Sequence, residues 1–152
     1  MLLQDLYIHI LSYTIAFFAG LFIITYLFNI PYLITNSQLV NEYYINNYLV
    51  NVPLDYIFVL LYIGLALLMA KLLHIDNLSY KIMIVTITTI ILTGGWTYYF
   101  QSLPYDKNNF FSKWFHGIGY KSIIYDIIIV VTIYIFYIYM IDYKLSNNPK
   151  NT

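Results

Sequence analysis

Two acidic residues stand where the sequence is otherwise almost free of charge. Asp55 and Asp126 each lie near the start of a long apolar segment, and Asp126 lies about 6 Å inside its segment at 1.5 Å per residue. A carboxylate is costly at that depth in a bilayer, and it normally faces the interior of a helix bundle. Two such carboxylates on one side of a membrane could share a proton or bind a cation.

Other polar side chains converge on the same side from neighbouring segments. The candidate intramembrane polar site comprises Asp55, Asp126, Tyr99, Tyr125, Thr93 and Thr97, with Trp96, Gln101, Lys113, His116 and Lys121 expected nearby. These residues can also be interpreted as purely structural, and for each residue considered alone the structural interpretation is favoured. Asp55 after Pro53 would be a helix N-cap, Asp126 a helix-start acid favoured by the macrodipole, and the threonines would bond back to their own helix.

The elements that must position these residues follow from composition. The chain has 152 residues, of which 61% are hydrophobic and 9% charged, against about 25% charged in soluble domains. A soluble fold of this size could not bury so much apolar surface, so the sequence predicts an all-α integral membrane protein. Zero net charge and seven Lys with no Arg exclude a nucleic-acid partner. The absence of Cys excludes disulfides and thiolate chemistry.

Four segments are long and apolar enough to cross a bilayer. They are predicted at about Leu6–Phe28, Asp55–His74, Ile82–Phe100 and Ser122–Tyr143, in a single domain spanning residues 1–152, with a polar C-terminal tail at 144–152. Each carries an inward-facing stripe of small or polar residues, which are Ser12, Ala16 and Gly20 with His9; Asp55, Val59, Tyr62 and Ala66; Thr86, Thr89, Thr93 and Thr97; and Asp126, Val130, Ile133 and Tyr137. Such stripes predict one four-helix bundle.

The number of spans sets the topology. Four spans place both termini on one side of the membrane, together with the turn at Ile75–Tyr80. Four of the seven lysines fall near that side and three near the other. The positive-inside rule then predicts cytoplasmic termini.

Both connections on the opposite side are expected to contain short interfacial helices. Phe110, Phe111, Trp114 and Phe115 recur at helical spacing, which predicts a helix lying in the headgroup region with its aromatic side chains in lipid. The stretch Thr35–Tyr48 is expected to do likewise, because Thr35 and Gln38 have the spacing of a capping box.

Known signatures of enzymes and of metal sites are missing from the sequence. The three His cannot supply the His-rich boxes of desaturases, no Ser stands in a nucleophile motif, and there is no Gly-rich phosphate loop. His9, His74, Asp5, Asp76 and Asp142 could meet on the side of the termini, but their spacing forms no recognised metal motif. We therefore expect no catalytic residue, no metal and no cofactor.

The segment from Gly94 to Phe100, followed by Tyr125 and Asp126, resembles small four-span membrane proteins of unknown function encoded by large DNA viruses of eukaryotes. More distantly it is similar to a bacterial family of predicted four-helix membrane proteins. The resemblance covers about a third of the chain and implies the architecture and a viral membrane, not an activity.

The sequence favours a non-enzymatic structural or interaction component of a cellular or viral membrane. Its expected partners are the lipid bilayer and other membrane proteins, or a second copy of itself. The alternative is a small transporter or channel for protons, cations or a polar small molecule that uses Asp55 and Asp126. A lipid-modifying enzyme is a third hypothesis, disfavoured by the missing motifs.

Overall fold

The computed structural model describes the backbone of residues 2–146 and the side chains of residues 6–143. This part of the chain is helical and contains no strand. Its long helices are α1 (Leu2–Leu21), which continues as the π-helix η1 (Phe22–Leu27), α4 (Tyr48–Leu72), α5 (Leu78–Ser102) and α7 (Lys121–Ser146). Four segments are long and apolar enough to cross a membrane, namely Leu6–Leu27, Tyr48–Leu72, Leu78–Ser102 and Lys121–Tyr143. The prediction of an all-α, four-helix membrane bundle is confirmed.

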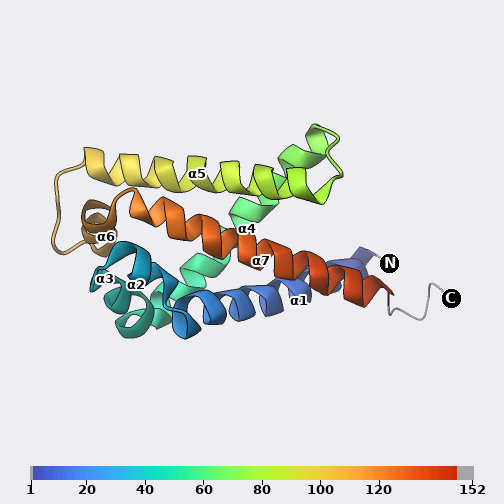
Figure 1. Cartoon of the computed structure of the whole chain (residues 1–152), viewed down its shortest axis with the longest axis horizontal. Helices are drawn as coiled ribbons and strands as arrows, with labels where there is room; N and C mark the ends of the chain where they lie inside the picture. Colours follow the sequence, from blue (N-terminus) through green and yellow to red (C-terminus); the bar gives the residue numbers. More distant parts are fainter. Residues whose placement is uncertain (1, 147–152) are drawn as a thin grey trace.

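Helix α7 lies at the centre of the bundle (Figure 1). It packs against α1 on one side and α5 on the other, and α4 packs mainly against α5. The beginning of α1, the end of α7 and the α4–α5 turn lie at one end of the molecule. The short helices lie at the other end, and they are α2 (Ile30–Thr35), α3 (Leu39–Asn41), the π-helix η2 (Glu42–Asn46) and α6 (Phe110–Ile118). This arrangement is the one that four crossings require.

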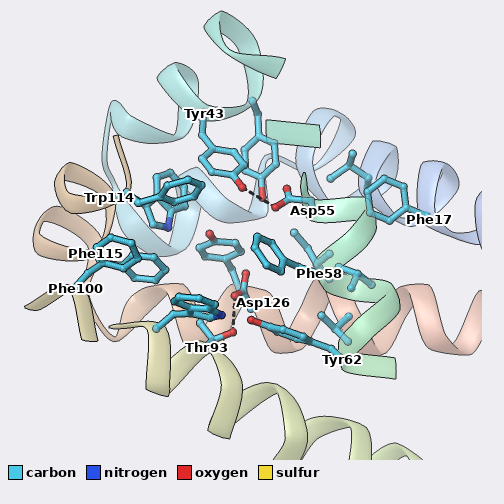
Figure 2. Close-up of a pocket in the computed structure, with 18 residues that line it drawn as sticks. Phe17, Tyr43, Asp55, Phe58, Tyr62, Thr93, Phe100, Trp114, Phe115 and Asp126 are labelled. Carbon is cyan, nitrogen blue, oxygen red and sulfur yellow. Dashed lines mark hydrogen bonds between the residues drawn. The ribbon is translucent and has the colours of Figure 1, made fainter. Parts of the chain in front are cut away.

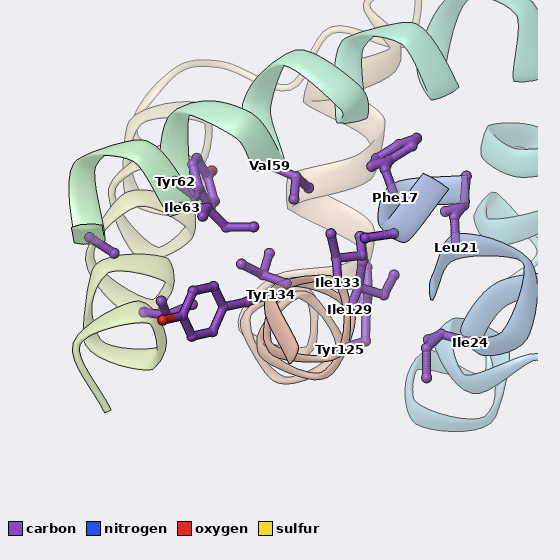
Figure 3. Close-up of a cluster of buried hydrophobic side chains, with 14 of the residues drawn as sticks. Phe17, Leu21, Ile24, Val59, Tyr62, Ile63, Tyr125, Ile129, Ile133 and Tyr134 are labelled. Atoms are coloured by element: carbon purple, nitrogen blue, oxygen red, sulfur yellow. The ribbon is translucent and has the colours of Figure 1, made fainter. Parts of the chain in front are cut away.

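Small residues allow α1 and α7 to approach closely. Ser12, Ala16 and Gly20 are all buried, as the predicted stripe requires. A Cβ atom added to Gly20 would lie 2.7 Å from Cγ1 of Ile133, which is fully buried in α7. Figure 3 shows Ile133 among the apolar side chains that α1, α4 and α7 contribute to the core.

The inward faces predicted for the other spans are also buried. Val59, Tyr62 and Ala66 of α4 are buried, and so are Val130 and Ile133 of α7. In α5 the buried threonines are Thr88, Thr89, Thr93 and Thr97, while Thr86 is half-buried. The hydroxyls of Thr86, Thr89 and Thr97 each donate to the carbonyl oxygen four residues back. The structural interpretation is therefore right for these three.

Helix α4 begins earlier than the sequence predicts. It starts at Tyr48, so Pro53 lies inside the helix and Asp55 is well beyond its first turn. Proline removes one N–H donor, which leaves the carbonyl of Leu49 without its helical partner. Leu49 is 73% exposed at the end of the span, where water can supply that partner. The interpretation of Asp55 as an N-cap is wrong.

The segment 35–48 also differs from its prediction. Thr35 does not begin a helix; it ends α2, and its hydroxyl donates to the carbonyl of Pro31. Asn36 takes a left-handed conformation with φ of 51°, which ends α2 before α3 begins.

Helix α5 has a side-chain cap at its start, and α7 extends beyond its predicted end. Asn77 caps the start of α5, because its side chain accepts from the amides of Ser79 and Tyr80. Helix α7 runs to Ser146, so the tail expected at 144–152 begins later, and residues 147–152 lie outside the described part.

Candidate functional site

A cavity of about 290 Å³ lies inside the end of the bundle that carries the short helices. Its lining comes from α1, η2, α4, α5, α6 and α7, so every long helix contributes (Figure 2). Asp55 and Asp126 both line it. The structure therefore brings together the two carboxylates that the sequence singled out.

Both carboxylates lie within the membrane-spanning helices. Asp55 is seven residues after the start of α4 and Asp126 is five residues after the start of α7. At 1.5 Å per residue these positions are about 10 Å and about 7 Å from the helix ends. Each residue is half-buried, because its carboxylate faces the cavity rather than a packed neighbour.

Asp55 is held by tyrosines of η2. The hydroxyl of Tyr43 donates to Asp55 Oδ1 at 2.6 Å, and the Tyr44 hydroxyl interacts with the side chains of Asp55 and Tyr125. Burial, together with the negative charge of Asp55, raises the pKa of Tyr43 well above its usual range, so this hydroxyl remains a donor. Asn51 donates to the carbonyl of Tyr43 at 3.1 Å and fixes η2 against α4.

Asp126 is held by Thr93 of α5. The Thr93 hydroxyl donates to Asp126 Oδ2 at 2.8 Å, whereas Thr86, Thr89 and Thr97 donate to carbonyls of their own helix. Tyr62 of α4 interacts with the same threonine and lies beside it in Figure 2. The carboxylate thus joins α7 to α5 through a hydroxyl group.

Neither carboxylate has a basic partner among the described side chains. The ion pair recorded there joins Lys113 of α6 to Glu42 of η2. Lys121, which the sequence placed near the site, donates to the carbonyl of Thr35 at 3.3 Å instead. The ring nitrogen Nδ1 of His116 lies 2.9 Å from the carbonyl of Ser112 in its own helix. Neutrality in the cavity must therefore come from bound protons or a bound cation.

Aromatic rings form most of the cavity wall. Eleven of the eighteen lining residues are aromatic, and they come from all the contributing elements. Trp114 lies with its ring centroid 4.6 Å from that of Tyr43 and perpendicular to Tyr125, while Phe115 stacks on Phe100 at 5.1 Å. Most of these rings therefore pack on one another around the cavity.

Helix α6 forms where the sequence predicts, but its aromatic face points the other way. Trp114 and Phe115 are buried in protein, Phe110 and Phe111 are half-buried, and Phe111, Trp114 and Phe115 line the cavity. The expectation that these side chains enter lipid is therefore wrong for Trp114 and Phe115. Helix α6 packs against α5 and α7, and it buries Trp114, Phe115 and Ile118 there.

The other predicted site residues divide into those inside and those outside the cavity. Thr93 and Tyr125 line it. Thr97 is buried next to it but bonds to Thr93 and Ser122, and it does not line the cavity. Tyr99 is 52% exposed on the outer face of α5, so its assignment to the site is wrong.

Three tyrosine hydroxyls at the site could not be recognised as such from the sequence. Tyr43, Tyr44 and Tyr62 all line the cavity and interact with its polar groups. Tyr62 was predicted to face inward, but its hydroxyl was not placed near Asp126. Nineteen tyrosines in the chain give no contrast from which to select these three.

The described residues contain no group of three or more His, Asp or Glu side chains arranged to hold a metal ion. At the end of the bundle where α1 begins and α7 ends, Nδ1 of His9 lies 2.9 Å from the Tyr137 hydroxyl. The side chain of Asp5, one of the residues considered there, lies outside the described part.

Comparison of the chain with protein-family models, with curated proteins and with solved structures gives no match. The class that fold and cavity define is that of an integral, multi-pass membrane protein. Its activity has to be inferred from the geometry of the cavity itself.

Proposed function

We propose that this protein is a small transporter that carries protons or a cation across the membrane, with Asp55 and Asp126 as the binding groups. One observation carries the proposal: two carboxylates from different membrane-spanning helices line one cavity, and no described basic side chain pairs with either. Intramembrane acids without a structural ion pair are typical of proton and ion pathways.

The energetics support exchange at this site rather than permanent occupancy. Two unpaired carboxylates in a low-dielectric cavity cannot both stay ionised without a counter-charge. Protons or a cation can supply that charge, and each would compete with the other for the same oxygens. A site that alternates between the two would couple their movements.

The helix contacts suggest which element moves. The backbones of α1 and α4 barely approach each other, whereas α7 packs closely against α1 and α5. Side chains bridge the α1–α4 gap: the Tyr13 hydroxyl donates to the Tyr56 carbonyl at 2.6 Å, and the hydroxyls of Thr14 and Tyr56 lie 2.9 Å apart. Tilting of α4 away from α1, with its packing on α5 kept, would widen the cavity and break few backbone contacts.

The test is proton or cation flux, with alkali and small ammonium ions supplied in turn, in liposomes that contain the purified protein. Asp126→Asn and Asp55→Asn keep the shape of each side chain and should each reduce flux at least tenfold. Asp76→Asn is the matched control, because Asp76 is exposed in the α4–α5 turn and should leave flux unchanged. Folded Asp55 and Asp126 variants with the flux of the parent would refute the proposal.

The second candidate is a structural or interaction role in a cellular or viral membrane. Gly64 in the middle of α4 supports it, because the glycine is exposed and a Cβ there would meet no atom within 4 Å. Small residues on an outer face let another transmembrane helix approach closely. Cross-linking of single-cysteine variants beside Gly64 in native membranes would detect such a partner.

A further inference from the structure

We infer that the cation bound in the cavity is a small ammonium ion, either a free amine or the ammonium headgroup of a lipid. The inference rests on the proposed function, since it names the substrate class for the same two carboxylates. It follows from the charge of the cavity, from the chemistry of its wall and from its size.

The charge of the cavity favours a cation over an anion or a neutral ligand. Among the described residues, Asp55 and Asp126 accept hydrogen bonds from hydroxyl groups, namely those of Tyr43 and Tyr44 for Asp55 and that of Thr93 for Asp126. Hydroxyl donors stabilise a carboxylate but do not neutralise it. An ammonium ion within reach of either carboxylate would supply the missing charge.

The wall distinguishes an ammonium ion from an inorganic cation. Hard metal cations need about six oxygen ligands, and the cavity offers two carboxylates and a few hydroxyls that already bond to each other. Ammonium groups are instead attracted to the faces of aromatic rings. Figure 2 shows Phe58, Tyr62 and Trp114 around the space that Asp126 enters, and Trp96 lines the same cavity.

The size of the cavity limits the ligand. A volume of about 290 Å³ lies at the lower end of the range of about 300–1,000 Å³ found for small-molecule sites. A choline-sized group fits such a space. The ligand is therefore one ammonium group with short substituents, free or on a headgroup.

The chain carries its own reporters for a binding test. Its two tryptophans, Trp96 and Trp114, both line the cavity. The full-length protein in nanodiscs of phosphatidylglycerol would be titrated with tetramethylammonium and with choline while tryptophan fluorescence is recorded. We expect a saturable change with both. The neutral carbon isostere of choline, 3,3-dimethylbutan-1-ol, should bind at least tenfold more weakly, a comparison that needs no variant.

Variants then assign the binding to the acid and to the rings. Asp126→Asn should weaken tetramethylammonium binding about tenfold, and Asp76→Asn should not. Phe58→Leu, which removes a ring but keeps an apolar side chain, should weaken binding about fivefold, while Phe58→Tyr retains it. Phe22→Leu is the control, since Phe22 is 58% exposed and does not line the cavity. Circular dichroism confirms that each variant is helical.

Nanodiscs of different lipids separate the two sources of the ammonium group. If a headgroup is the ligand, phosphatidylcholine in place of phosphatidylglycerol should compete and raise the apparent Kd of tetramethylammonium. If a free amine is the ligand, the Kd should not change with the lipid. Either result supports an ammonium site.

Two results would overturn the inference. One is equal binding of the neutral isostere and tetramethylammonium, and the other is no saturable response to any ammonium compound. Proton flux without ammonium binding would reject the ammonium site and leave the proposed transport intact. Saturable ammonium binding in a protein that carries no flux would support the ammonium site and reject the proposed transport.

Discussion

Asp55 and Asp126 differ from the exposed acids of the chain in what surrounds them. Their hydrogen-bond donors come from other helices, Thr93 of α5 for Asp126 and Tyr43 of η2 for Asp55. Each bond therefore ties two elements together and orients a carboxylate toward the cavity at the same time. Loss of one donor should affect stability and ligand affinity through the same oxygen atom.

Tyr43→Phe should lower the free energy of unfolding by about 1–3 kcal/mol, because it removes the hydroxyl that donates to Asp55 and leaves the ring packed on Trp114. The measurement is a titration with sodium dodecyl sulfate in mixed micelles, followed by circular dichroism. Tyr98→Phe is the control, since Tyr98 is 78% exposed, and it should change stability by less than about 0.5 kcal/mol. Equal stabilities of the two variants would contradict the role given to Tyr43.

The sequence allowed the acids of the site to be predicted, but not most of its wall. An acid inside an apolar segment is conspicuous, so Asp55 and Asp126 could be paired by topology alone. A tyrosine is not conspicuous among nineteen. The sequence assigns Tyr99 to the site, whereas the tyrosines that line the cavity include Tyr43 and Tyr44. Which ring faces the cavity depends on how each helix is rotated about its axis, and the number of tyrosines gives no information about that rotation.

The helices of the bundle follow from hydropathy, whereas their ends follow from local chemistry. The spans of α1, α5 and α7 were predicted to within a few residues. The start of α4 was not, because Pro53 was read as a helix boundary although a helix can contain proline where water meets the freed carbonyl. Helix α6 was predicted from its spacing, but spacing identifies an apolar face without showing whether lipid or protein covers it.

Because α1 packs closely against α7, adding a single methyl group at Gly20 should destabilise the bundle. Gly20→Ala places a Cβ 2.7 Å from Cγ1 of the buried Ile133 side chain, so either this side chain or the α1–α7 spacing must shift. We expect a loss of about 1–3 kcal/mol in the free energy of unfolding, measured in the same micelle titration.

The matched control for this prediction is Gly64→Ala, where the added Cβ meets nothing within 4 Å. That variant should stay within about 0.5 kcal/mol of the parent. If Gly20→Ala were as stable as Gly64→Ala, the close α1–α7 contact would be wrong.

At the scale of the whole molecule, the two ends of the bundle differ in structure. One end holds the beginning of α1, the end of α7 and the α4–α5 turn, and the other holds the short helices that cover the cavity (Figure 1). Glu42 and Lys113 join η2 to α6, and Lys121 joins the start of α7 to the end of α2. The cavity is thus close to one membrane surface, which any transport cycle must connect to the other.

Because the chain contains no cysteine, single cysteines can map its orientation in the membrane. Asp76→Cys and Asp142→Cys lie at the end of the bundle where α1 begins and α7 ends. Asn47→Cys and Lys107→Cys lie at the end with the short helices, and all four positions are exposed. A maleimide that cannot cross membranes should label the first pair from one side and the second pair only from the other. The lysine distribution predicts that the first pair faces the cytoplasm. Labelling of Asp76→Cys and Lys107→Cys from the same side would mean that α5 does not cross the bilayer, and the two carboxylates would then lose their shared position in the membrane.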